Sequence, residues 1–72
     1  MKILDNGGKT VDRYTIILGG DMYAASSDPF HPMGIGMYCG SFAGGSTRHL
    51  GKTVKWENLP DPVKKYISYL KS

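Results

Sequence analysis

The sequence contains a single cysteine and no apolar run that approaches the ~18 residues of a membrane span. One cysteine cannot form an internal disulfide, so we expect no oxidised framework and a reducing, cytoplasmic setting. The opening residues MKILDNGG break before the apolar segment of a signal peptide could form. These absences predict a cytoplasmic protein that has no membrane partner.

Intact catalytic and phosphate-binding motifs are also missing. The triplet Gly51-Lys52-Thr53 lacks the glycine that a P-loop needs five residues earlier, where Ser46 stands. Gly34 and Gly36 lack the third glycine and the following helix of a dinucleotide fingerprint. No two cysteines or histidines have the spacing that presets two zinc ligands on one element. We therefore expect no catalytic residue, no metal and no cofactor.

A metal or thiol site remains an alternative, because the chain contains Asp28, His31, Cys39 and His49. Cys39 and His49 would suit a thiolate–imidazole pair, which activates cysteine nucleophiles. A Cys/His-dependent enzyme would still need an oxyanion site, and so small a domain leaves little room for a cleft. The simpler interpretation is a histidine in a turn, a buried cysteine and a histidine at the start of a strand.

Size and composition predict one small globular domain over residues 1–72. Hydrophobic residues make up 40% of the chain and charged residues 21%, which is too apolar for disorder. A core of this size contributes only about 3–5 kcal/mol of net stability. An enclosed catalytic cleft is therefore not expected.

The strongest strand signal is the segment TVDRYTIIL, residues 10–18, because β-branched and aromatic residues favour a pleated sheet. Alternate side chains share one face of a strand. The face predicted to be apolar consists of Tyr14, Ile16 and Leu18. Gly19-Gly20 then favours a tight hairpin, so we expect residues 22–25 to return antiparallel.

Two further segments are weaker strand candidates. Residues 2–5 precede the turn Asn6-Gly7-Gly8 and form either a short first strand or a loose terminus. Residues 50–56 predict a strand whose Val54 and Trp56 face inward. Together the segments predict a small antiparallel sheet of three or four strands.

The C-terminal segment has the pattern of one short amphipathic helix. Asp61 is a favourable N-cap and Pro62 suits the first turn. The apolar residues at helical spacing are Val63, Tyr66, Ile67 and Leu70. Because so short a helix is unstable alone in water, we expect it to pack on the sheet and give an α+β fold. The predicted core is Tyr14, Ile16, Leu18, Val54, Ile67 and Leu70, with Trp56 and Tyr66 also expected inside.

Residues 26–45 form a long central loop in this interpretation. They include two prolines and five glycines, and proline pushes the residue before it out of helical conformations. The alternation of Ile35, Met37 and Cys39 with glycine also fits a glycine-weakened edge or bulged strand. A loop this long in a small domain is usually either functional or misassigned.

Basic residues are concentrated towards the C-terminus. Residues 1–47 contain three basic and four acidic residues, whereas residues 48–72 contain six basic and two acidic ones. This asymmetry is compatible with an acidic partner or with nucleic acid, although the lysines form no basic run or basic–aromatic signature. An accessory protein that binds nucleic acid is therefore the second interpretation, through Arg48, Lys52, Lys55, Lys64 and Lys65.

Several short motifs between residues 12 and 70 resemble a group of proteins. The motifs are Asp12-Arg13-Tyr14-Thr15-Ile16, Asp28-Pro29 followed by Pro32-x-Gly34, Tyr38-Cys39, His49-Leu50-Gly51-Lys52, and Leu59-Pro60 followed by a helix. Together they resemble short uncharacterised proteins of phages, plasmids and bacterial chromosomes, although segment 41–46 is longer than that likeness predicts. The resemblance implies an α+β fold and a mobile-element context, but no activity, cofactor or site residue.

The resemblance and the central loop both favour binding over catalysis. Small phage proteins of this type are often inhibitors of a host machine, including anti-CRISPR proteins, which is an argument by analogy. The loop also has more aromatic and methionine side chains than so small a domain can bury, and such side chains anchor protein interfaces. The predicted apolar anchor consists of Phe30, Met33, Met37, Tyr38 and Phe42.

We therefore predict a non-enzymatic protein that binds and inhibits a host protein complex. Arg48, Lys52 and Lys55 are expected to form a basic rim that steers an acidic or nucleic-acid-binding surface towards the anchor. Two alternatives use the same loop: self-association into a homodimer, and a loop that is only a lid over the sheet.

Overall fold

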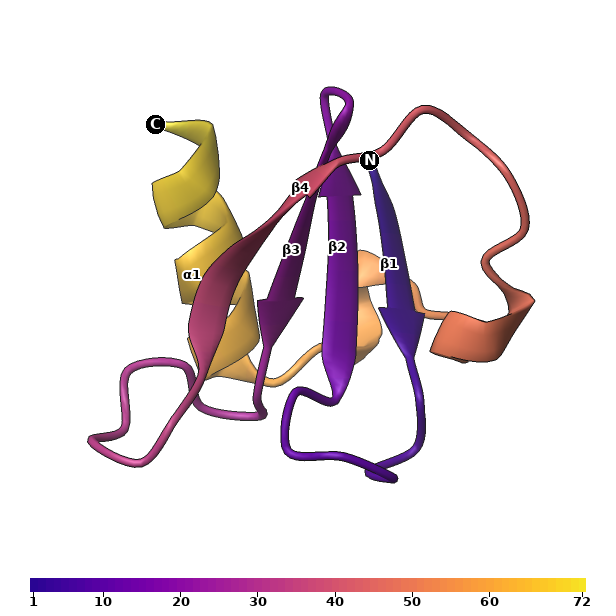
Figure 1. Cartoon of the computed structure of the whole chain (residues 1–72). Helices are drawn as coiled ribbons and strands as arrows, with labels where there is room; N and C mark the ends of the chain where they lie inside the picture. Colours follow the sequence, from indigo (N-terminus) through magenta and orange to yellow (C-terminus); the bar gives the residue numbers. More distant parts are fainter.

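The computed structural model describes all 72 residues and shows one antiparallel sheet with an α-helix on one of its faces (Figure 1). The elements are β1 (Lys2–Asp5), β2 (Tyr14–Leu18), β3 (Asp21–Ala25), β4 (Gly36–Ser41), η1 (Arg48–Leu50), β5 (Lys52–Thr53), η2 (Trp56–Asn58) and α1 (Asp61–Lys71), where η is a 3-10 helix. The order across the sheet is β4-β3-β2-β1-β5. The α+β prediction is confirmed, but the sheet has five strands and not three or four.

The hairpin of β2 and β3 forms the middle of the sheet, as predicted. Leu18 pairs with Asp21, and the two glycines between them have φ angles of 59° and 85°. Two successive positive φ angles give a turn whose twist matches that of the flanking strands. Alternate pairs along the hairpin, Ile16 with Tyr23 and Tyr14 with Ala25, carry apolar side chains towards the helix.

The N-terminal residues are an interior strand and not a loose terminus. β1 pairs antiparallel with β2 on one side and with β5 on the other. The loop that joins β1 to β2 is fixed by an ion pair, in which Arg13 Nε lies 2.7 Å from Asp5 Oδ1. Ile3 and Leu4 are both buried, Ile3 within the main core cluster and Leu4 outside it.

Part of the predicted central loop is the edge strand β4, so the strand interpretation of Ile35 to Cys39 is the correct one. Gly36 pairs with Ala25, and Tyr38 pairs with Tyr23. The register then shifts so that Gly40 pairs with Met22, which leaves Cys39 as the extra residue of a bulge. Backbone pairing has therefore overridden the low strand propensity of glycine.

The predicted strand over residues 50–56 is wrong for most of its length. Only Lys52 and Thr53 pair with β1, and a 3-10 helix lies on either side of them. Trp56 starts η2 and is 38% exposed, so it is not an inward-facing core residue. Val54 does pack against the core, and its N–H donates to the Ile3 carbonyl over 2.8 Å.

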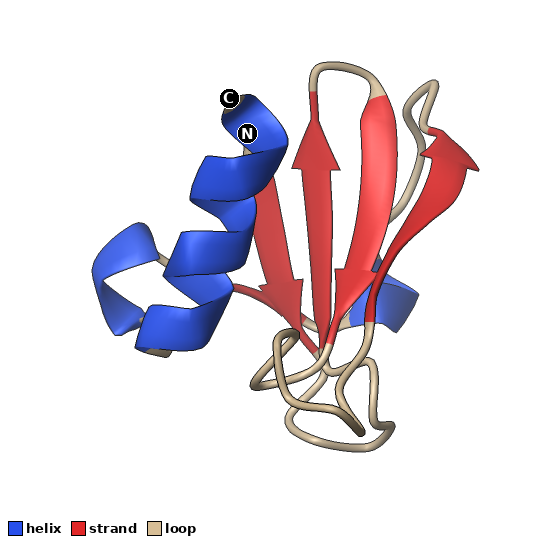
Figure 2. Cartoon of the chain, turned by 90° about the vertical axis from the view of Figure 1, so that its left-hand side faces the viewer, coloured by secondary structure: helices blue, strands red, loops and turns tan.

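Helix α1 packs on one face of the sheet, as Figure 2 shows from the side. The buried cluster is Ile3, Tyr14, Ile16, Ala25, Leu59, Val63, Tyr66 and Ile67, with Leu18, Tyr23, Val54 and Leu70 packed around it. The predicted core is therefore confirmed, although Leu18, Val54 and Leu70 are only partly buried. The N-cap is Pro60 and not Asp61, whose carboxylate instead lies in the first turn, near the positive end of the helix dipole.

Candidate functional site

Strand β4 is the exposed edge of the sheet. Five of its six residues are exposed, and none carries a charge. Gly36 allows the strand to pass closely over α1, because a Cβ atom there would lie 2.8 Å from Tyr66 Cε1. The sequence therefore places a long, uncharged strand at the edge of the sheet.

Aromatic side chains gather where β4 lies against α1. The rings of Tyr23 and Tyr38 are 5.5 Å apart and those of Phe30 and Tyr66 6.3 Å apart, both edge to face. Such pairs add about 0.5–1.5 kcal/mol to the effect of burial alone. Phe30 is 51% exposed, Tyr38 56% and Tyr69, one turn beyond Tyr66, 69%. We call Tyr23, Phe30, Tyr38, Tyr66 and Tyr69 together the aromatic surface.

The β3–β4 loop holds Phe30 in place through its own hydrogen bonds. The Ser26 N–H donates to the Ile35 carbonyl over 2.8 Å, which closes the base of the loop. Within it, Asp28 Oδ1 accepts from the Phe30 N–H and His31 Nδ1 from the Met33 N–H. Phe30 is therefore presented by an ordered turn.

Charge and protonation around the aromatic surface favour contact with a partner. Burial raises the pKa of Tyr66, and the neighbouring Tyr23, Cys39 and Tyr69 act in the same direction. Tyr66 is therefore a neutral phenol at physiological pH. The Lys65 ammonium lies 5.2 Å from the centroid of the Phe30 ring, so the surface has a cation at its border.

The other three predicted anchor residues do not join the aromatic surface. Met37 pairs with Ala24, so its side chain lies on the face opposite that of Tyr38. Met33 lines a separate cleft, described below. Phe42 is only partly exposed, and its N–H donates to the Gly20 carbonyl over 2.7 Å, which continues the pairing beyond β4.

The predicted basic rim lies at the opposite edge of the sheet. β4 and β5 are the two outermost strands, and the segment after β4 leads across the molecule to η1 on the β5 side (Figure 1). Arg48 in η1 and Lys52 in β5 line a cleft at that edge together with Lys9, and Lys55 follows β5. The structure therefore places Phe30 and Tyr38 in two separate aromatic pairs on the β4 side of the sheet, and it separates both from Arg48, Lys52 and Lys55.

The candidate metal and thiol residues do not converge. No three histidine, cysteine or acidic residues lie close enough to share a metal ion. Cys39 is exposed on β4 and not buried, and its thiol lies 3.9 Å from the Met37 carbonyl oxygen. His49 is within η1, beyond the other edge of the sheet, and not at the start of a strand. The structure therefore places Cys39 and His49 apart.

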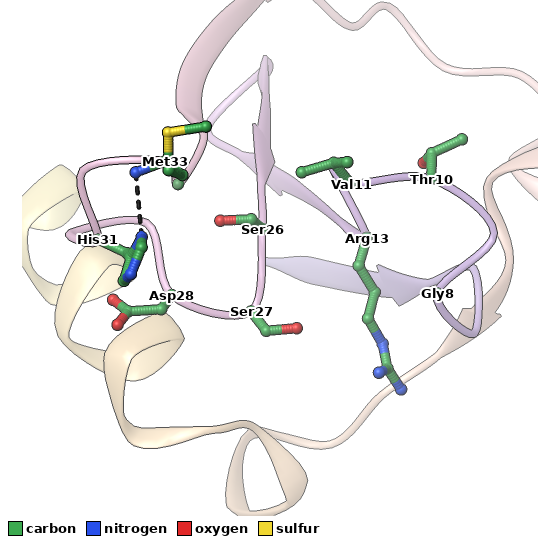
Figure 3. A pocket seen from close by; sticks show the side chains of 10 residues that line it. Gly8, Thr10, Val11, Arg13, Ser26, Ser27, Asp28, His31 and Met33 are labelled. Atoms are coloured by element: carbon green, nitrogen blue, oxygen red, sulfur yellow. Dashed lines mark hydrogen bonds between the residues drawn. The ribbon is translucent and has the colours of Figure 1, made fainter.

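A shallow cleft of about 370 Å³ lies between the β1–β2 and β3–β4 loops (Figure 3). Its polar groups are largely engaged: Arg13 bonds to Asp5, and His31 and Asp28 bond to backbone N–H groups of their own loop. Figure 3 shows the Arg13 side chain directed away from His31 and Asp28. These side chains stabilise the two loops.

No family model matches the chain, and neither does any curated protein or solved structure. The functional interpretation therefore rests on the residues and their arrangement. No helix in the structure has both the length and the apolar character needed to cross a membrane.

Three residues of these surfaces, Tyr23, Tyr69 and Lys9, were missed by the sequence analysis. Tyr69 could have been found, because it lies three residues after Tyr66 on the predicted helix. Lys9 could not have been found from the sequence, because it lies in the same cleft as Arg48 and Lys52 only through the pairing of β1 with β5.

Proposed function

We propose that this protein is a non-enzymatic binding protein that docks on another protein through β4 and the aromatic surface. The observation that carries the proposal is the open edge of β4, which has six residues, five of them exposed and none charged. Natural edge strands are normally protected by short length, lysine, proline, a bulge or a covering element, because their unpaired backbone groups attract other strands. β4 has a bulge but no charge, proline or further strand on its outer side.

The opposite edge provides an internal comparison. β5 has only two residues, begins with Lys52 and lies between Arg48 and Lys55. Short length and positive charge are the devices that discourage strand addition. Only one edge of this sheet therefore has the properties of a docking strand.

The shape of β4 favours a partner that contributes an extended segment. Such a segment would form main-chain hydrogen bonds with the free side of the strand, which supply affinity. Phe30, Tyr38 and Tyr69 would then contact side chains of the partner and supply specificity. Aromatic residues are frequent interface anchors because they contribute a large contact area for few rotatable bonds.

The resemblance to mobile-element proteins extends the proposal to a host protein complex that is inhibited on binding. This extension depends on the short sequence motifs alone. The basic rim is not part of the proposal, because Arg48, Lys52 and Lys55 are separated from the aromatic surface by the width of the sheet.

A capture experiment tests the proposal. The intact protein and the double variant Phe30→Ser, Tyr38→Ser would be immobilised and exposed to a bacterial lysate. The matched control is Val11→Ser, Trp56→Ser, which also removes two exposed apolar side chains, from the β1–β2 loop and from η2. Circular dichroism would first show that all three proteins are folded.

We expect the control to retain the same partners as the intact protein and the test variant to lose them. Equal retention by both variants would contradict the proposal. Sedimentation of the purified protein over a range of concentrations tests whether a second copy of this chain binds to β4. Self-association that the Phe30→Ser, Tyr38→Ser change abolishes would make a second copy of this chain the partner of β4.

A further inference from the structure

A second cleft, of about 480 Å³, lies at the β5 edge, away from β4. It is bounded by the turn after β1 and by the segment from η1 to β5. Its charged side chains are Asp5, Lys9, Arg48 and Lys52, and its only apolar side chain is Val54. The cleft is therefore polar and contains an excess of cations.

The one acidic group of this cleft is already neutralised. Asp5 accepts two hydrogen bonds from Arg13, at 2.7 Å from Nε and 3.0 Å from Nη2. This ion pair is the only one in the structure. Lys9, Arg48 and Lys52 consequently have no acidic partner, and three positive charges face one cleft.

The backbone keeps these cations together. Asn6 Oδ1 accepts from the N–H groups of Gly8 and Lys9, which fixes the turn that carries Lys9. On the other side, Gly51 lies against the Asp5 backbone with no room for a Cβ atom. This close approach brings the η1–β5 segment, which carries Arg48 and Lys52, beside the turn.

We propose that this cleft binds a phosphate group, either free or carried by a nucleotide or nucleic acid. Arg48 suits a phosphate because guanidinium can donate two parallel hydrogen bonds to it, and the two lysines act as point charges. The turn's N–H groups at Gly7, Gly8 and Lys9 already bond to side-chain oxygens, so recognition would come from the cationic side chains. The site is independent of the proposed protein-binding edge.

The test is a titration followed by amide NMR shifts, with inorganic phosphate, adenosine monophosphate and a short single-stranded oligonucleotide as separate probes. We expect the shifts to centre on Lys9, Arg48 and Lys52. The variant Arg48→Ala, Lys52→Ala should bind at least about tenfold more weakly, because charge-assisted hydrogen bonds are lost. The matched control compares single changes: Lys71 lies on α1 outside the cleft, and Lys71→Ala removes the same charge as Lys52→Ala. Lys71→Ala should bind nearly as well as the intact protein, whereas Lys52→Ala should bind more weakly.

The probes also identify the source of the phosphate. Tighter binding of the oligonucleotide, with a steep loss of affinity in salt, assigns the site to nucleic acid, whereas equal binding of all probes assigns it to a free or mononucleotide phosphate. Equal weakening by the test and control variants would overturn the proposal, since only overall charge would then matter. Absence of shifts around the cleft with every probe at millimolar concentration would also overturn it. The variant Lys52→Arg keeps the charge at the same position and should retain binding. It therefore distinguishes loss of the charge from a loss of folding caused by substitution at this position.

Discussion

Gly51 connects η1 to β5 at a point where a side chain has no space. Its φ angle is 116°, and a Cβ atom would lie 2.7 Å from the backbone nitrogen of Asn6. We expect Gly51→Ala to lower the free energy of unfolding by about 1–3 kcal/mol or more, through backbone strain and the clash. Gly45→Ala is the matched control, because Gly45 has a φ angle of 115° and open space around it. Equal losses in urea denaturation would contradict the steric argument.

The carboxyl group of Asp5 makes the free energy of unfolding depend on pH. Its hydrogen bond from Arg13 lowers its pKa below the ordinary value of about 3.9, against an opposing effect of burial. A carboxyl with a lowered folded-state pKa stabilises the fold at pH values above its unfolded-state pKa. That stabilisation is lost as the pH falls through the folded-state pKa.

Melting temperatures of the intact protein and of Asp5→Asn therefore test this ion pair. We expect the intact protein to melt at a higher temperature at neutral pH, and the gap to narrow as the pH falls below about 4. A gap that stays the same down to the lowest pH would show that Asp5 contributes through something other than its charge.

At the scale of elements, α1 should stabilise the fold mainly through its buried residues Val63, Tyr66 and Ile67, which pack on the sheet. Ile67 is completely buried, so Ile67→Ala should cost about 2–5 kcal/mol, comparable with the whole net stability of so small a domain. Tyr69→Ala removes a larger but mostly exposed side chain from the same helix and should cost much less. An Ile67→Ala protein with an unchanged melting temperature would contradict the packing of α1 on the sheet.

The elements that could be predicted from the sequence are those specified locally. The β2–β3 hairpin has its turn in Gly19-Gly20 and its apolar face in alternate residues, and α1 has its stripe at helical spacing. β4 depends on pairing with β3 across the irregular loop of residues 26–35, and β5 depends on pairing with β1, which is distant in sequence. The glycine alternation around Cys39 was compatible with an edge or bulged strand, but the position of the bulge follows from the register with β3.

The candidate site was predictable only in part, for a similar reason. Phe30 and Tyr38 are exposed as predicted, because the single helix does not cover its face of the sheet as far as the outer edge of β4. Their separation from Arg48 could not be predicted. Only the strand order shows that the segment between Phe42 and Thr47 leads from one edge of the sheet to the other.

At the scale of the whole molecule, the two edges of one sheet have different surfaces. Strand β4 itself has no charged residue and lies beside the aromatic surface, with only Lys65 and Asp21 as charged neighbours of its rings, whereas the β5 edge contains the cations of the second cleft. Uncharged contacts are weakly affected by salt, but phosphate contacts release counterions. We therefore expect partner capture through β4 to persist at high salt in the lysate assay. If the amount of captured partner instead falls steeply as the salt concentration rises, the partner binds at the β5 edge and not at β4.

The central claim is that β4 is the docking strand, and amide hydrogen exchange on the captured complex tests it most directly. Pairing with a partner strand hydrogen-bonds the outward N–H groups of β4 and slows their exchange. We predict that residues 36–41 become protected when the partner binds, with β5 unchanged. Protection that appears around residues 48–53 or on α1 while residues 36–41 exchange as in the free protein would contradict the account.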